Sequence, residues 1–529
     1  MMKKNILTII LIASSLYAGL WNPNLPDSQY RNPVLYSDYS DPDVIRVGDD
    51  FFMTASSFNC VPGLPILLSK DLVNWRLVNY ALPQLSSRFD EPRPGDGVWA
   101  PSIRYREGLF YIYYGDPDSG IYQVKTKDLF GVWDEPVLVK SAYGNIDPCP
   151  FWDDDGSVYL VHAFAHSRAG VKSLLQINQL SADGTRVLDK GTIVFDGHQQ
   201  HPTIEGPKLY KRNGYYYIFA PAGGVKEGWQ TVLRSKSIFG PYENKIVLGQ
   251  GETAINGPHQ GAWVELETGE SWFLHFQENG PWGRIVHLQP MEWKNDWPVI
   301  GNDSDGDGTG EPALQFRKPG LNTHEESVCT KFVDTFERSM LDLNWQWYAN
   351  PAINWFSVDE NAGTLRLYAV SKRDPNDNLW HTPNLLLQKF PSPEFTAVAE
   401  IRDVVFEEGC RAGLVVMGLD YGTLTIRPDS SDFLLEMSLC LNSEEDGKEK
   451  VKASSVLTRN EFPLILKVHV DADGNCQFYF EANGRDQVFG PAFSAKPGKW
   501  IGAKVGLFCE SVFDHDCAQY AEFQKFEIN

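Results

Sequence analysis

The chain has 529 residues, which is too long for one ordinary domain and fits two large ones. Apolar residues make up 42% of it and aromatic residues 13%, with many Gly and Pro, so the composition suits packed cores built from short strands and turns. Stretches with helical periodicity are scarce, so we expect a mostly β protein. A formal charge of −22 argues against partners such as nucleic acid or acidic lipid, and it favours neutral or cationic partners such as neutral glycans.

Residues 1–20 are typical of an export signal. Lys3 and Lys4 provide a basic start, and the apolar run "NILTIILIASSLYAG" ends in small residues, which fits cleavage after Ala18. At about 15 residues this run is shorter than the roughly 20 that a bilayer span needs, so we expect no membrane span. The mature protein is expected in the periplasm or the external medium.

Five similar hairpins come next in the chain. They begin at Asp41 ("DPDVIRVGDDFFMTAS"), Ala100 ("APSIRYREGLFYIYYG"), Asp147 ("DPCPFWDDDGSVYLVH"), Glu205 ("EGPKLYKRNGYYYIFA") and Gly261 ("GAWVELETGESWFLHF"). Gly, Asn and Asp at the turns supply the positive φ that tight hairpins need. The starts are spaced by 59, 47, 58 and 56 residues, a repeat that suits the blades of a propeller. Segments such as "PILLSKDLVNWRLVN", "GIYQVKTKDLFGVWDEP" and "TVLRSKSIFGPYE" are expected to hold third and fourth strands.

The repeat predicts an all-β fold with a five-bladed β-propeller over residues 28–315; a sandwich of unrelated hairpins is the alternative. The polar stretch "GNDSDGDGTGEP" then places Asp303, Asp305 and Asp307 at the spacing of a calcium loop, but Leu314 stands where that loop needs a Glu, which favours a plain turn.

Residues 325–529 lack the repeat and show short alternating segments: "TLRLYAV", "TAVAEIRDV", "AGLVVMGL", "LILKVHV", "CQFYFEA" and "AKVGLFCE". Alternation with frequent turns predicts a β-sandwich accessory domain. The eight Cys show neither a dense disulfide pattern nor a metal-binding spacing, so most are expected to be buried free thiols.

Three of the five hairpin starts carry acids: Asp41, Asp147 and Glu205. The first strand of each propeller blade lines the central channel, so these acids are expected to converge at one mouth. Glycoside hydrolysis needs a protonated carboxyl and an ionised carboxylate on opposite sides of the scissile bond, and a third carboxylate can raise the pKa of the acid. Alternatively, Asp-Pro and Glu-Gly are simple turn formers.

Several motifs together resemble glycoside hydrolase family 43, in particular its two-domain β-xylosidases and α-L-arabinofuranosidases. They are Asp41-Pro42 after "NPVLYSDYS", "IRVGDDFFMTASSF", "LLSKDLVNW", "VWAPSIRY" and "EGPKLYKRNGYYY", with "FVDTFERSMLDLNWQWYANP" at the start of a concanavalin-like sandwich. The resemblance implies a five-bladed propeller and single-displacement inversion. It also implies that Asp41 is the general base, Asp147 the residue that tunes the pKa and orients the acid, and Glu205 the general acid.

The same resemblance implies substrate-binding roles for four further residues. Phe58 and Trp99 match aromatic pocket positions, His259 a central histidine that supports the pocket, and Arg284 an arginine that binds the terminal sugar and the modulating carboxylate. Each has a structural alternative: core packing for the aromatic residues and His259, a surface ion pair for Arg284. In similar proteins the sandwich also lends a loop aromatic to the rim, which restricts the site to chain ends.

The function expected from these features is an exported, exo-acting inverting glycosidase. It would release terminal α-L-arabinofuranosyl residues, or β-D-xylosyl residues, from plant hemicellulose such as arabinoxylan, arabinan or xyloglucan. The segment around Cys60, which replaces an aromatic common in xylosidases, favours arabinofuranosidase. The alternatives are a β-D-xylosidase on xylo-oligosaccharides, a non-catalytic carbohydrate-binding propeller and an endo-arabinanase. No cofactor is expected in catalysis; a structural calcium ion would find ligands in Asp334 and Glu522, although acidic surface residues abound.

Overall fold

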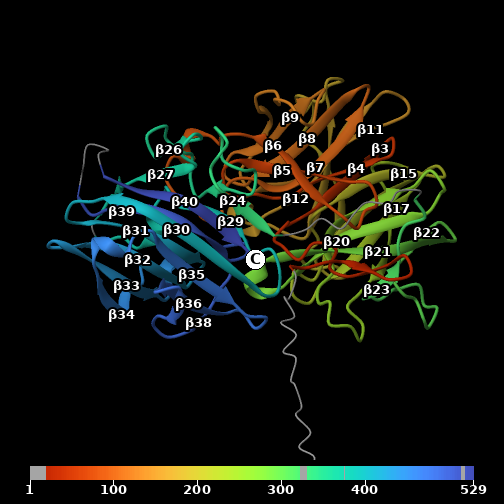
Figure 1. The fold of residues 1–529 in the computed structure, drawn as a ribbon. Coiled ribbons are helices and arrows are strands. Elements are labelled where there is room, and N and C mark those ends of the chain that lie inside the picture. The colour runs from red at the N-terminus through yellow and green to blue at the C-terminus, as the bar shows by residue number, and fades with distance from the viewer. Residues whose placement is uncertain (1–19, 322–330, 375, 514–518) are drawn as a thin grey trace, which may run out of the picture.

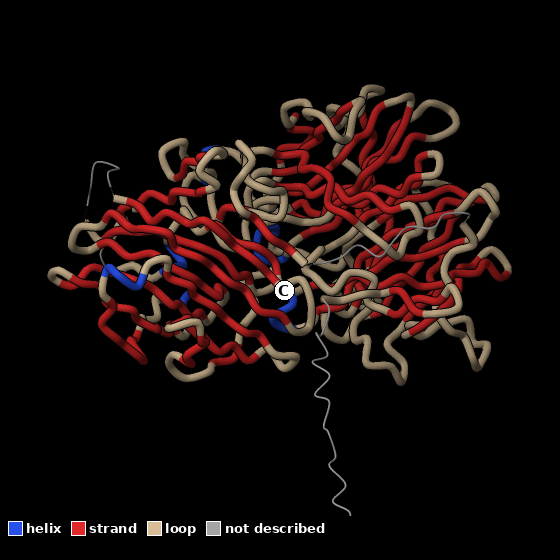
Figure 2. The backbone as a smooth tube through the Cα atoms, viewed as in Figure 1, coloured by secondary structure: helices blue, strands red, loops and turns tan. Residues whose placement is uncertain are grey.

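A computed structural model describes residues 20–321, 331–374, 376–513 and 519–529. Residues 1–19 of the expected export signal, together with Cys329 and Cys517, lie outside these ranges. The chain forms an N-terminal and a C-terminal β-rich half that lie against each other (Figure 1). Helix is confined to single turns (Figure 2): α1 (His166–Ala169), η1 (Ser87–Phe89), η2 (Gly280–Trp282), η3 (Leu379–His381), η4 (Ser443–Glu445) and η5 (Arg459–Glu461).

The N-terminal half, as far as it is described, contains five four-stranded antiparallel sheets in chain order. Their strands are β3 (Asp43–Val47), β4 (Asp50–Thr54), β5 (Gly63–Ser69) and β6 (Arg76–Leu82); β7 (Trp99–Arg106), β8 (Leu109–Asp116), β9 (Gly120–Thr126) and β10 (Val137–Ser141); β11 (Asn145–Trp152), β12 (Val158–Phe164), β13 (Leu174–Leu180) and β14 (Thr192–Asp196); β15 (Lys208–Arg212), β16 (Tyr215–Ala222), β17 (Trp229–Ser235) and β18 (Glu243–Leu248); β19 (His259–Glu265), β20 (Ser271–Glu278), β21 (Arg284–Lys294) and β22 (Trp297–Ile300).

The five predicted hairpins are confirmed as the first two strands of these sheets. Local chemistry explains the turns: Asn213 and Gly214 between β15 and β16 both have positive φ, as do Glu107 and Gly108 between β7 and β8, which matches the twist of a two-residue hairpin loop. Two fourth strands were misplaced by the sequence pattern: β10 begins at Val137, after the segment expected to contain it, and β18 shares only its first residue, Glu243, with its expected segment.

The five sheets follow one another around a ring. Backbone contacts join β3 to β7, β7 to β11, β11 to β15 and β19 back to β3. Apolar side chains fill the space between each neighbouring pair of sheets: Ile66 with Ile112, Tyr113 with Leu160, Ile177 with Ile218, Phe219 with Phe273, and Leu274 with Val44 share buried clusters. The last sheet therefore packs on the first.

A small sheet joins the two ends of this half. It consists of β1 (Asn24–Leu25), β2 (Gln29–Arg31) and β23 (Gln315–Arg317), with Tyr30 opposite Phe316. The hairpin repeat gave no hint of this sheet, because its strands are two or three residues long and pair across nearly the whole half.

The C-terminal half contains a nine-stranded and an eight-stranded sheet, which agrees with the predicted β-sandwich. The first consists of β24 (Phe332–Asp334), β26 (Phe356–Asp359), β27 (Thr364–Tyr368), β30 (Phe395–Val405), β35 (Leu464–Val470), β36 (Asn475–Ala482), β37 (Arg485–Val488), β38 (Phe493–Ser494) and β40 (Tyr520–Ile528). The second consists of β25 (Gln346–Trp347), β28 (Val370–Ser371), β29 (Leu386–Lys389), β31 (Cys410–Met417), β32 (Tyr421–Asp429), β33 (Asp432–Cys440), β34 (Lys450–Leu457) and β39 (Lys504–Ser511).

All six segments predicted in this half fall on strands: β27, β30, β31, β35, β36 and β39. Their alternation has the expected cause, since β35 buries every second side chain from Leu464 to Val470. The hairpin of β32 and β33 was not predicted; β32 is buried along most of its length on both faces, so it does not alternate.

The two halves share one apolar core. Val61, Trp282 and Ile285 of the N-terminal half belong to the same buried cluster as the interior of the sandwich. Backbone hydrogen bonds link Val61 and Trp347 in both directions, and the Ala503 N–H donates to the Pro281 carbonyl at 2.7 Å. These contacts fix a loop of the sandwich, residues 496–503, against the mouth of the ring.

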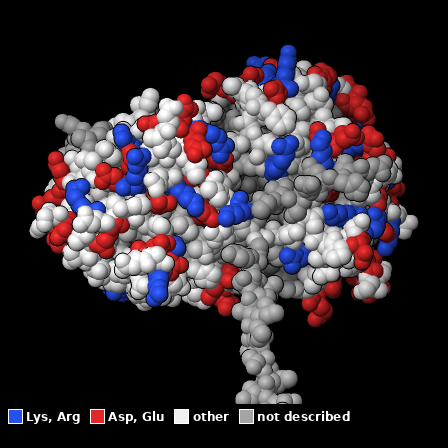
Figure 3. Space-filling model, in the orientation of Figure 1, with Lys and Arg blue, Asp and Glu red and all other residues white. Residues whose placement is uncertain are grey.

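Positive and negative side chains are interspersed over the face seen in Figure 3. Within the described ranges, no helix combines the length and apolar character needed to cross a membrane. Six cysteines fall in these ranges, Cys60, Cys149, Cys410, Cys440, Cys476 and Cys509, and all six are buried free thiols, as expected.

Candidate active site

A cavity of about 120 Å³ lies at one mouth of the ring. It is lined by Asp41, Phe58, Trp99, Ala100, Ile146, Asp147, Glu205, Val225, Gln260, Arg284 and Trp500. The opposite ends of β3, β7, β11, β15 and β19 line a separate opening. The three acids expected to converge thus reach one small cavity.

Asp41 precedes β3 and is held by three donors. The hydroxyls of Ser40 and Ser56 donate to Oδ2 at 2.8 and 2.5 Å, and Arg284 Nη1 lies 3.3 Å from Oδ1. Asp41 is 4% exposed and Arg284 7%. Charge-assisted bonds of this kind are among the strongest in proteins, so they fix the orientation of the Asp41 carboxylate in the cavity wall.

Asp147 sits in a β-bulge near the start of β11, where the register with β12 shifts between Ile146 and Cys149. Its φ is 57°, and that of Asp41 is 56°. Few residues other than Gly adopt this left-handed conformation, but Asp tolerates it, and such outliers and bulges concentrate at active sites. The Asp-Pro pairs are therefore local turns whose shape aims both carboxylates into the cavity.

The pKa of Asp147 is raised to about 7, mainly by burial and also by the charge of Asp41. The Gly206 N–H, which donates to Asp147 Oδ2 at 2.8 Å, acts in the opposite direction, as do the charges of Lys208 and Arg284. Lys208 is fully buried, and its amine donates to the Pro101 carbonyl at 2.7 Å and the Ser102 hydroxyl at 2.8 Å. It places a fixed positive charge beneath the acids.

Glu205 precedes β15, and its backbone N–H donates to the Pro221 carbonyl. Its side chain is 29% exposed, toward the cavity. The pKa of Glu205 is raised to about 8, mainly by desolvation and also by the charges of Asp147 and Asp41. Glu205 therefore carries a proton at neutral pH, which is the state that a general acid needs.

His259 begins β19 behind the acids, with Nε2 3.5 Å from Glu205 Oε1. It is fully buried, and neither ring nitrogen has a hydrogen-bond partner in the described part of the chain. The pKa of His259 is lowered to about 3, mainly by burial and also by the charge of Arg284, so the ring is neutral. His259 thus supports Glu205 from below and does not line the cavity.

Aromatic side chains from both halves form the cavity walls. Phe58 and Trp99 meet edge to face at 6.3 Å, and Trp99 meets Trp500 in the same way at 6.3 Å. Trp500 lies in the sandwich loop 496–503 and is 46% exposed. Flat apolar faces beside carboxylates suit a sugar, which presents apolar ring faces and a hydroxylated edge.

One expected contact differs in the structure. Arg284 was expected beside the modulating carboxylate, Asp147, but its guanidinium pairs with Asp41 and donates to the Ser40 hydroxyl at 2.6 Å. The reason is the packing of β21, because the backbone of Arg284 is bonded to the segment that carries Asp41: its N–H donates to Asp38 Oδ1, and its carbonyl accepts from Tyr39. Arg284 acts on Asp147 through its charge.

Other residues of the site carried no sequence signal. Ser40 and Ser56 are common loop residues, and Gln260 and Trp500 acquire their place only through the tertiary fold. A loop aromatic from the sandwich was expected, but its position was not assigned. The motif signal that could have flagged Gln260 is its place next to His259 before the fifth hairpin.

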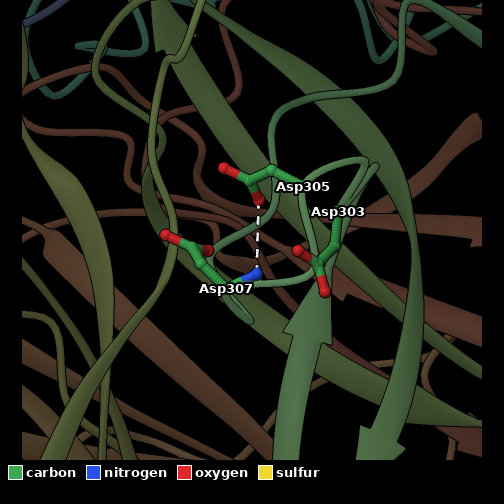
Figure 4. A group of neighbouring side chains, drawn as sticks. All are labelled: Asp303, Asp305 and Asp307. Atoms are coloured by element: carbon green, nitrogen blue, oxygen red, sulfur yellow. Dashed lines mark hydrogen bonds between the residues drawn. The ribbon is translucent and has the colours of Figure 1, made fainter.

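Carboxylate groups away from this cavity have other partners. Asp303, Asp305 and Asp307 bring ligand atoms within 4.8 Å of one another (Figure 4). Their oxygens accept N–H groups of their own loop, as in the Asp305–Asp307 contact, and Lys294 lies 3.3 Å from Asp303.

The two residues suggested for calcium also have separate partners. Asp334 accepts from the Trp345 indole at 3.0 Å, and Glu522 pairs with Arg366 at 2.7 Å and Arg402 at 3.6 Å. Two arginines beside Glu522 oppose a divalent cation at that carboxylate.

Family models match both halves of the chain. The model of glycosyl hydrolases family 43 matches residues 30–298, and that of the β-xylosidase C-terminal concanavalin A-like domain matches residues 333–529. The first range contains Asp41, Asp147 and Glu205; the second contains Trp500.

Individual proteins show the same similarity. A protein of Xylanibacter ruminicola that carries the provisional name β-xylosidase is 39% identical over 494 residues, covering 91% of this chain and 86% of its own. A non-reducing end α-L-arabinofuranosidase of Bacteroides ovatus is 31% identical over 444 residues, or 79% of each chain. The crystal structure of a xylan β-1,4-xylosidase from Bacillus halodurans has the same fold, with a TM-score of 0.83 and 24% identity over 94% of this chain and 99% of its own.

Proposed function

Because the chain belongs to glycosyl hydrolases family 43 and is therefore a glycosidase, we propose that it is an exo-acting, inverting enzyme that removes terminal β-D-xylosyl or α-L-arabinofuranosyl residues from plant hemicellulose. The observation that carries this proposal is the meeting of Asp41, Asp147 and Glu205 in one small cavity, with Glu205 protonated at neutral pH.

In this proposal the three acids divide the reaction between them. Glu205 donates its proton to the glycosidic oxygen as that bond breaks, and Asp41 takes a proton from the water that attacks the anomeric carbon from the opposite face. Asp147 raises the pKa of Glu205 by its charge and orients it through the chain, since it binds the N–H of Gly206. Every proton is thus accounted for by a side chain of the cavity.

Two features support an exo mode of action. The cavity is small, about 120 Å³, and Trp500 from the sandwich closes one side of it. An endo-acting enzyme needs an open groove that a glycan chain can cross. For the fold, we infer that the five sheets are the blades of a five-bladed propeller, because each packs on the next and the last packs on the first.

The sugar at the chain end is proposed from the relatives. The 39% identical protein has the provisional name β-xylosidase, which puts β-D-xylosyl first, and the 31% identical arabinofuranosidase supports α-L-arabinofuranosyl as the second candidate. Cys60, which favoured arabinose in the sequence, is 2% exposed and packs behind Phe58 rather than in the cavity. Its effect on the sugar would therefore be indirect.

The proposal extends to the place where the enzyme works. The basic and apolar features of residues 1–20 support export and cleavage after Ala18. A periplasmic or secreted enzyme would meet neutral oligosaccharides released from plant cell walls, which suits a chain with a strongly negative formal charge.

The test measures turnover of p-nitrophenyl β-D-xyloside, p-nitrophenyl α-L-arabinofuranoside and xylobiose by the purified chain, and follows by proton NMR the xylose released from the aryl xyloside. We expect turnover of at least one aryl glycoside and first appearance of the α anomer of xylose. Asp41→Ala and Glu205→Gln should each lower turnover of the disaccharide by orders of magnitude. Release of the β anomer at the earliest times, or full activity of either variant, would contradict the assigned roles.

A further inference from the structure

A second, larger cavity of about 300 Å³ lies between the two halves. We call it the interdomain cavity. It is lined by residues from the N-terminal segment and the first sheet on one side, and from β24, β29 and β40 of the sandwich on the other. No residue lines both this cavity and the active-site cavity. Its volume is at the lower end of the range for small-molecule sites, and domain interfaces are a common place for such sites.

Six of the side chains that line the interdomain cavity are aromatic. Trp21, Tyr36, Tyr39, Trp75, Tyr80 and Phe332 all line it. Trp21 and Tyr36 lie 5.0 Å apart at a tilt of 54°. A group of rings arranged around an open space offers flat apolar surfaces to a flat apolar ligand.

The charge of the cavity is unlike that of the chain. Its described lining includes Arg76, Lys331 and Lys389 but no Asp or Glu, whereas the chain as a whole has a formal charge of −22. The Lys331 amine is already paired with Glu527 at 2.9 Å. The cavity is therefore a local site of positive charge, which favours an anion.

Lys389 is the cation that lacks a matching anion. It ends β29, and its amine lies 3.6 Å from the centre of the Tyr39 ring. Among the described residues it has no hydrogen bond and no carboxylate within ion-pair distance; Asp38 acts on it only through its charge. Burial lowers the pKa of Lys389 to about 7, which reflects how poorly its charge is compensated.

From these contacts we propose that the interdomain cavity binds a small aromatic monocarboxylate, with its carboxylate at Lys389 and its ring between the aromatic side chains. The carboxylate supplies the missing anion, and the ring packs on the aromatic walls. A neutral sugar fits less well, because it supplies no anion for Lys389.

Isothermal titration calorimetry of the full chain with 4-hydroxycinnamate tests this site. We expect saturable binding of one molecule per chain. Lys389→Met keeps the length of the side chain and removes its charge, so it should weaken binding about tenfold or more, the value of a lost charge-assisted hydrogen bond. Lys331→Met, which removes an amine that is already paired, is the matched control and should leave the affinity within about threefold.

Further binding measurements show where the probe binds and which of its chemical groups the site recognises. Trp500→Ala should bind 4-hydroxycinnamate as the unchanged chain does, because Trp500 belongs to the other cavity. 4-Hydroxycinnamyl alcohol, which lacks the carboxylate, and glucuronate, which lacks the aromatic ring, should each bind much more weakly. Equal binding of the alcohol, equal binding of glucuronate, or an unchanged affinity in Lys389→Met would overturn the proposal, as would the absence of saturable binding.

A measurement on the unaltered protein covers the case in which Lys389→Met fails to fold. Limited acetylation with acetic anhydride, read by peptide mass spectrometry, reports the accessibility of each amine. 4-Hydroxycinnamate should protect Lys389 and leave exposed lysines such as Lys452 unchanged. Labelling of Lys389 that is unaffected by saturating probe would also overturn the proposal.

Discussion

Replacing Glu205 with Gln is expected to abolish turnover and, at the same time, to stabilise the protein. The pKa of Glu205 rises from an ordinary value of 4.5 to about 8 in the folded chain. A carboxyl whose pKa is raised by folding binds its proton more tightly in the folded state. Its contribution to stability is therefore fully present below pH 4.5, is lost as the pH rises towards 8, and stays lost above it.

The magnitude follows from the size of this shift. Between pH 4.5 and pH 7 the folded chain loses at most about 3.5 kcal/mol relative to the unfolded chain, since each pH unit contributes about 1.4 kcal/mol. Glu205 is 29% exposed to the cavity, so a working range of about 1–3 kcal/mol is reasonable at pH 7. Gln has no charge to desolvate, so the stability of the Glu205→Gln variant should not fall in this way as the pH rises.

The assay is thermal unfolding of both proteins from pH 5 to pH 9. We expect nearly equal Tm values at pH 5 and a growing advantage of Glu205→Gln towards pH 8, at about 2–4 °C for each kcal/mol in a domain of 150–250 residues. Glu252→Gln, at an exposed position, is the control and should show no such trend. A Tm difference that does not change with pH, or a variant less stable than the unchanged chain, would refute the reasoning.

Three further predictions concern the rate. The rate on xylobiose should fall as the pH rises through about 8, because Glu205 loses the proton that it must donate; a rate that is constant to pH 9.5 would contradict this. Ser56→Ala should lower kcat/KM about 10- to 100-fold, because it removes a buried donor 2.5 Å from the Asp41 carboxylate and such a bond is worth about 1.5–3 kcal/mol. Steady-state kinetics on the disaccharide measure this change. An unchanged kcat/KM would mean that Arg284 and Ser40 suffice to hold Asp41. Trp500→Ala should raise KM for xylobiose about 2- to 10-fold with little change in Tm, because Trp500 forms an exposed wall of the cavity. An unchanged KM would show that Trp500 does not contact the substrate.

Local sequence was sufficient to find the five hairpins of the N-terminal half, because each combines a turn sequence with alternating apolar residues. The Asn213-Gly214 turn demands positive φ, and the alternating residues on either side can bury only one face. The pattern failed where local rules compete with packing. Strand β10 follows a loop held by the buried Trp133, and β32 is buried on both faces. The sequence pattern therefore does not locate either strand.

The candidate site was only partly visible for a similar reason. Asp41, Asp147 and Glu205 stand at equivalent points of a repeat, so the sequence could predict that they meet. Arg284 was named, but its partner was wrong, because the choice between Asp41 and Asp147 depends on the backbone bonds of β21 to Tyr39 and Asp38. Such bonds join segments some 245 residues apart and leave no local pattern.

The sequence by itself determined the class of fold, the repeat and the identity of the three acids, since these depend on residue type and spacing along the chain. Only the tertiary structure decided the charge state of Glu205, the partner of Arg284, the place of Trp500 and the existence of the interdomain cavity. Each of these depends on which distant groups share a water-poor space. The free energy of a charged side chain in such a space depends on the groups around it and not on the order of residues along the chain.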